Sequence, residues 1–129
     1  MREALLAGSI VQFKSTGRSL EPLVFSGDVC FLHPVLPGCN SQILPGDIIF
    51  CHVQPGNRYY THLVWRTYKY KTKYDVEKDV FIIGNNRDGD KKKCNGWCFR
   101  EHIYGILTQT QHGDIEIVRE ERFEDDCMQ

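Results

Sequence analysis

Glycine and proline recur at short intervals along the chain, and this punctuation limits the length of every regular element. Glycine favours turns, and proline continues neither a helix nor a central strand, so long helices have no room. The segments between these residues are mostly rich in β-branched and aromatic side chains, which favour strands. The sequence therefore predicts a mainly β fold with minor short helices. The predicted strands are 10–14, 29–33, 47–53, 59–71, 79–84, 103–110 and 115–118.

The length of 129 residues is that of one domain with a core of its own. We expect a single domain over residues 1–118, followed by an acidic, flexible tail over 119–129. A short helix is predicted at 3–8 and a second one directly after Ser19. The alternating pattern of the long segment 59–71 predicts a strand that leads into a hairpin near 72–78.

The charge of the chain is nearly balanced, with 16 basic and 17 acidic residues. No overall field therefore attracts nucleic acid or an anionic membrane, and nucleic acid is not an expected partner. The one local exception is the basic, tyrosine-rich hairpin around 68–78, together with the lysines at 91–93, since aromatic and basic side chains together bind single strands. The apolar segments are strand-sized, so we expect no transmembrane helix, no signal peptide and a soluble intracellular, for example cytoplasmic, protein.

Six cysteines are present, and without an export signal we expect them as reduced thiols. Cys94 and Cys98, followed by His102, resemble part of a zinc site. Their spacing is not the usual one, and a fourth ligand is not identifiable. We therefore expect neither a bound metal nor another cofactor.

Three kinds of side chain suggest nucleophilic catalysis. Ser19 follows Gly17 and Arg18 in a turn, which exposes its hydroxyl, and His62 lies in an apolar, β-prone segment. Asp88 and Asp90 lie on a predicted loop. A serine needs an adjacent base to become nucleophilic, and a carboxylate can orient that base. Each residue also has a structural interpretation: a capping serine, a strand histidine and turn-forming aspartates.

Four ordered segments resemble the fold shared by type I signal peptidases and self-cleaving LexA-type repressors. Gly17-Arg18-Ser19-Leu20-Glu21-Pro22 is similar to the family's G-x-S-M-x-P, with leucine in place of methionine. Ser26-Gly27-Asp28-Val29 and Leu44-Pro45-Gly46-Asp47-Ile48-Ile49 are similar to its two G-D turns. Gly84-Asn85-Asn86-Arg87 is similar to its G-D-N-R, with the carboxylate replaced by asparagine. The resemblance covers about residues 14–108 and implies coiled antiparallel sheets that form a partly open barrel.

By this resemblance, Ser19 is the nucleophile and His62 is the general base, as in the histidine-type members of the family. Asp90, or else Asp88, would orient the imidazole. Gly17 and Arg18 belong to the turn whose backbone amides would bind the oxyanion. Asp28 and Asp47 are expected to bond turn amides and not to take part in catalysis. The implied reaction is endoproteolysis, through an acyl-enzyme, of a peptide bound as an extended strand.

Two specialised roles in the family are not supported by the sequence. Signal peptidases generally carry a membrane helix or an apolar docking surface, so contact with a membrane lacks support here. A LexA-type repressor needs a helix-turn-helix before the core, and the segment before Ser19 is too short for one. A stand-alone protease and a domain of a longer product remain open. So does a catalytically inactive module that binds a peptide or nucleic acid through its basic hairpin.

Overall fold

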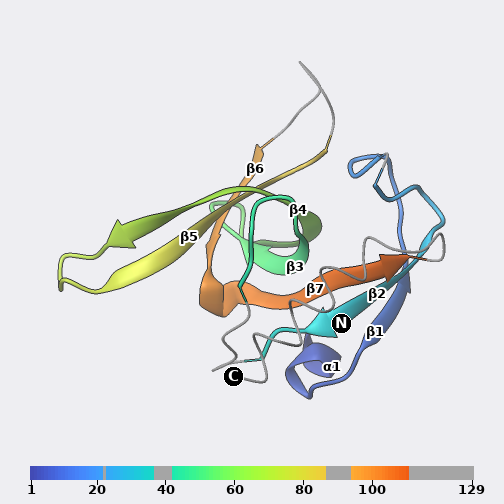
Figure 1. Cartoon of the computed structure of the whole chain (residues 1–129), viewed down its shortest axis with the longest axis horizontal. Coiled ribbons are helices and arrows are strands. Elements are labelled where there is room, and N and C mark those ends of the chain that lie inside the picture. Colours follow the sequence, from blue (N-terminus) through green and yellow to red (C-terminus); the bar gives the residue numbers. More distant parts are fainter. Residues whose placement is uncertain (22, 37–41, 87–93, 111–129) are drawn as a thin grey trace.

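In the described part of the chain, seven antiparallel strands form one sheet in the order β1-β2-β7-β3-β4-β5-β6 (Figure 1). The computed structural model describes residues 1–21, 23–36, 42–86 and 94–110. The prediction of a mainly β fold is confirmed. The elements are α1 (Arg2–Leu6), β1 (Val11–Lys14), β2 (Val29–Pro34), β3 (Ile48–Val53), β4 (Arg58–Lys71), β5 (Glu77–Gly84), β6 (Cys94–Phe99), the 3₁₀ turn η2 (Arg100–His102) and β7 (Ile103–Thr110).

The predicted strands agree with β1–β5 and β7 to within two residues at each end. The predicted hairpin is also confirmed, because the Thr72 N–H donates to the Val76 carbonyl (2.8 Å) between β4 and β5. This hairpin projects from the body of the molecule as a long arm (Figure 1). The predicted strand at 115–118 and the tail at 119–129 lie outside the described residues.

Two details of the prediction are wrong. The segment after Ser19 is a turn and not a helix: the Leu23 and Val24 N–H groups both donate to the Leu20 carbonyl (2.9 and 3.1 Å). A second turn begins at Phe25 and leaves no length for a helix. In addition, β6 was not predicted, because its asparagine and glycine have low strand propensity. Pairing of β6 with β5 overrides that propensity.

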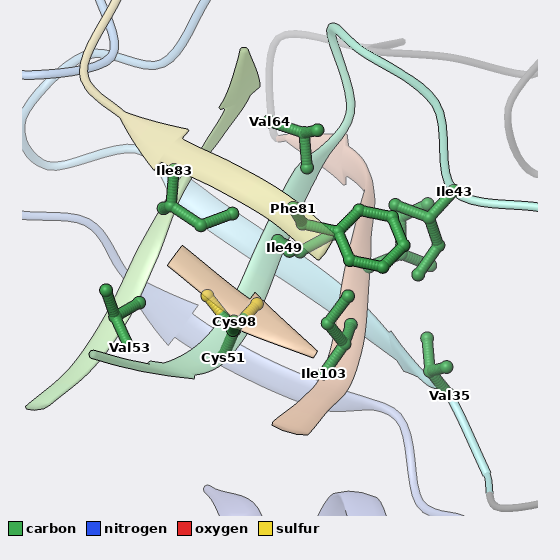
Figure 2. Packing of buried hydrophobic residues seen from close by; sticks show 11 residues of the cluster. Val35, Ile43, Ile49, Cys51, Val53, Val64, Phe81, Ile83, Cys98 and Ile103 are labelled. Atoms are coloured by element: carbon green, nitrogen blue, oxygen red, sulfur yellow. The ribbon is translucent and has the colours of Figure 1, made fainter. Parts of the chain in front are cut away.

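Strand β3 is buried on both faces over its apolar segment Ile48–Cys51, and only His52 is partly exposed. Ile49, Cys51 and Val53 point into one hydrophobic cluster, which Figure 2 shows from close by. Ile48 and Phe50 point into a second cluster on the other side. Strand β3 thus lies between the two halves of the core, and β4 pairs directly with it.

The two G-D turns have the same internal hydrogen bonds. The Asp28 carboxylate accepts from the Phe25 N–H (2.8 Å), and the Asp47 carboxylate accepts from the Leu44 N–H (2.8 Å). Gly27 and Gly46 supply the positive φ that each turn needs (91° and 94°). Both carboxylates are buried in structural roles, which confirms that they serve the turns.

The sheet curls between β3 and β6 until these two strands meet. Beyond the end of β3, Gln54 and Trp97 exchange two backbone hydrogen bonds (2.8 and 2.9 Å). The close approach depends on Gly96, since a Cβ there would lie 1.9 Å from the Gln54 carbonyl oxygen. Gly96 also has a φ of 137°, which side chains rarely permit.

No helix in the described part of the chain is both long and apolar enough to cross a membrane.

We expect Gly96→Ala to lower the free energy of unfolding by about 3 kcal/mol or more, because the new methyl group must push two backbones apart. Gly56→Ala is the matched control. Its Cβ would meet only the flexible Arg58 side chain, at 3.9 Å or more, so we expect a change within about 1 kcal/mol. Urea denaturation measures both values. Equal effects of the two substitutions would contradict the assignment of Gly96 to a backbone contact.

Candidate functional site

Ser19 and His62, far apart in the sequence, line the same cavity of about 240 Å³. Residues 13–17, from the end of β1 into the Ser19 turn, form one wall. Residues 59–62 of β4 form another, and Leu20, Val24, Cys30 and Leu107 complete the lining. The sequence prediction paired Ser19 with His62, and the fold brings both to one cavity. No hydrogen bond joins their side chains among the described residues.

The Ser19 turn is fixed by contacts on both sides of the serine. Leu20 and Val24 are buried in the second cluster and anchor the turn to the core, as the leucine-for-methionine exchange allows. From the other side, the Asn86 N–H donates to the Ser19 carbonyl (2.6 Å). The side-chain amide of Asn86 also donates to the Glu21 carbonyl (3.1 Å). These contacts leave Ser19 half-buried at the cavity wall.

The segment containing Asn86 is itself attached to the strand that carries His62. Strand β4 has a bulge between Val64 and Arg66, where its register with β5 shifts. The intervening Trp65 donates its indole N–H to the Asn85 carbonyl (2.8 Å). Bulges commonly redirect a side chain near a site. Here the bulge connects β4, through Asn85 and Asn86, to the Ser19 turn.

His62 is oriented by the backbone. Its register is set by pairing with Ile49 of β3. Its Nδ1 lies within hydrogen-bonding distance of the Thr61 carbonyl. A carbonyl oxygen only accepts, so Nδ1 carries the proton and Nε2 of the neutral ring is the acceptor. The Tyr60 ring stacks on the imidazole, with centroids 4.9 Å apart. This carbonyl contact could not be predicted from the sequence, since it depends on the side-chain rotamer.

Burial lowers the pKa of His62 below its usual 6.5, because it penalises the charged form. The hydrogen bond to the Thr61 carbonyl acts in the opposite direction but is the smaller cause. The ring is therefore neutral at pH 7, the state in which it can accept a proton.

Two other nucleophilic groups line the cavity, the Ser15 hydroxyl and the Cys30 thiol, and neither is as available as Ser19. The Ser15 hydroxyl donates to the Phe25 carbonyl (2.6 Å). Burial, followed by the charge of Asp28, raises the pKa of the Cys30 thiol to about 11, so no thiolate forms there at pH 7. Ser19 is thus the better candidate for a nucleophile.

The turn before Ser19 presents a backbone donor. Gly17 has a φ of 80° and lines the cavity. No described group accepts a hydrogen bond from the Ser19 N–H, which makes it the candidate donor to a carbonyl oxygen of a ligand. The Arg18 side chain does not line the cavity, because it is exposed and pairs with Glu21 (2.8 Å).

The predicted carboxylates, Asp88 and Asp90, lie outside the described residues. The partial zinc motif is not assembled: Cys98 is buried beside Cys51, while the His102 ring packs near Phe99. No cluster of three or more metal-ligating side chains occurs among the described residues.

The lysines of the hairpin arm are largely paired. Lys69 contacts Asp79 (2.6 Å), Lys71 contacts Asp75 (2.8 Å) and Lys78, on β5, contacts Glu101 (2.9 Å). Neutralised lysines attract phosphates less than free ones do. The arm is therefore a weaker candidate for nucleic-acid binding than its composition indicates.

Comparison of the chain with protein-family models, curated proteins and solved structures finds no match.

We expect the stability of the protein to depend on His62 in a defined pH window. The folded-state pKa lies below 6.5, so between these two values the unfolded chain binds more protons. The free energy of unfolding therefore rises with pH through this window, and the contribution is lost as the pH falls below about 6.5. Urea denaturation should show wild type losing more stability than His62→Gln between pH 7.5 and 5.5. Parallel profiles would contradict the lowered pKa.

Proposed function

We propose that this protein is a serine endopeptidase with a Ser19–His62 pair, on a fold of the signal-peptidase and LexA type. The observation that carries this proposal is the shared cavity, where a half-buried serine faces the same space as a neutral histidine. The mainly β architecture, the two G-D turns and the Asn86 segment next to Ser19 support it.

In the proposed reaction the Ser19 hydroxyl attacks the scissile carbonyl while His62 Nε2 takes its proton. The Ser19 N–H stabilises the oxyanion of the tetrahedral intermediate. His62 then returns the proton to the leaving amine, which leaves an acyl-enzyme on Ser19. Water, deprotonated by the same ring, hydrolyses this ester. The Thr61 carbonyl keeps the proton on Nδ1 in each step, so that Nε2 is the atom that gains and loses a proton.

The substrate would be an extended peptide. Strand β1 pairs with β2 on one side, and no described strand pairs with its other edge. Phe13 and Lys14, at the end of β1, continue directly into the cavity wall. A peptide that adds as a strand at this edge would be led toward Ser19.

We expect a fluorophosphonate probe to label the folded protein once, on Ser19. Ser19→Ala should abolish labelling, and Ser15→Ala is the control, since this second serine of the cavity is already hydrogen-bonded to a carbonyl. His62→Gln should slow labelling by about 10²–10⁴-fold, the usual contribution of a general base. Intact-protein mass spectrometry measures each rate. An unlabelled but folded wild-type protein would point to the inactive binding module.

The labelling rate should also report the protonation of the base. Because burial holds the pKa of His62 below 6.5, the rate should already be at its plateau at pH 7, and it should fall only at some pH lower than 6.5. A rate that keeps rising between pH 8 and 10 would instead indicate a lysine base. Labelling reactions quenched at fixed times across this pH range distinguish a histidine base from a lysine base. Circular dichroism at each pH shows whether the protein stays folded.

A further inference from the structure

Two buried cysteines, Cys51 and Cys98, face each other inside the core. Cys51 lies on β3 and Cys98 on β6, which are not neighbours in the order of the sheet. Both side chains are fully buried, and their thiols hydrogen-bond to each other. Figure 2 shows the two sulfur atoms side by side. The contact exists because the sheet curls until β6 meets β3.

The surrounding backbone holds these two strands in fixed register. Gln54 and Trp97, beside the pair, exchange two hydrogen bonds, and Gly96 lets the backbones approach. The Cys51 thiol also donates to the Tyr60 carbonyl (3.8 Å) on β4. The pair therefore lies where the curled part of the sheet closes, beside the strand that carries His62.

We propose that Cys51 and Cys98 form a disulfide, which closes the curled half of the sheet covalently when the chain meets a small-molecule disulfide such as oxidised glutathione. In the balanced reaction, two thiols and one RSSR give the Cys51–Cys98 disulfide and two RSH. The protein loses two electrons to the reagent, and both thiol protons pass to the released thiols. The proposal is independent of the proposed peptidase activity.

The environment of the thiols determines when this exchange takes place. The hydrogen bond with Cys98 and burial raise the pKa of Cys51, so the thiolate needed for attack is scarce in the folded protein. Exchange accordingly occurs while the chain folds, or when β6 separates transiently from β3. Cys94 is exposed on the same strand and reacts first with surface reagents.

The test is to refold the full chain in a glutathione redox buffer, alkylate the free thiols and map the peptides without reduction. We expect a Cys51–Cys98 cross-linked peptide as the main disulfide, and a thermal midpoint higher by about 10 °C than in the reduced protein. The folded reduced protein should form the same link slowly with oxidised glutathione, and faster in sub-denaturing urea. Recovery of both cysteines as free thiols, or in other pairs, would overturn the proposal, as would a linked protein less stable than the reduced one.

Two variants serve as controls. Cys30→Ala leaves the link intact, since Cys30 lies in the other cluster and its thiol donates to the Asp28 carbonyl (3.6 Å). Cys94→Ser also leaves it intact and removes the exposed competitor. Loss of the cross-link in either variant would mean that these residues, and not the buried pair, carry the disulfide.

Discussion

The burial of β3 on both faces is the constraint on which the rest of the molecule depends. A strand with apolar side chains on both sides can be satisfied only by two separate hydrophobic clusters, and the remaining elements supply them. Strands β5 and β6 contribute to one cluster, α1, β1, β2 and the Ser19 turn contribute to the other, and β4 and β7 contribute to both. Since β3 pairs with β4, its placement also fixes the position of His62.

Local chemistry made part of this fold predictable. The G-D turns follow from a glycine with positive φ and an aspartate that accepts from the amide three residues earlier, and both signals are adjacent in the sequence. Strand positions followed from β-branched and aromatic segments between turns. By contrast, β6 has little intrinsic strand preference and forms because β5 offers it a partner. Such non-local pairing is not visible in a single sequence.

The candidate site, too, could be predicted from the sequence only in part. The types of residue that could do the chemistry, Ser19 and His62, were recognisable from the sequence because each lies in a motif-like segment. The Asn86 segment was recognisable too, but the contacts that position the site were not: Asn86 donates to the backbone carbonyls of Ser19 and Glu21, and the Thr61 carbonyl orients His62. Backbone groups are common to all residues, so a sequence contains no signal for these contacts.

Orientation of the imidazole by a carbonyl has a chemical consequence. A carboxylate at Nδ1 would fix the tautomer and also stabilise the positive charge that appears on the ring during attack. A carbonyl dipole fixes the tautomer equally well but stabilises that charge less, and burial disfavours it further. A base of this kind is always available at neutral pH, yet it forms its imidazolium at a higher cost in free energy. In the proposed peptidase, stabilisation of the transition state would therefore depend more on oxyanion binding by the turn, and the anchoring of Ser19 by Leu20 and Asn86 would matter as much as the histidine.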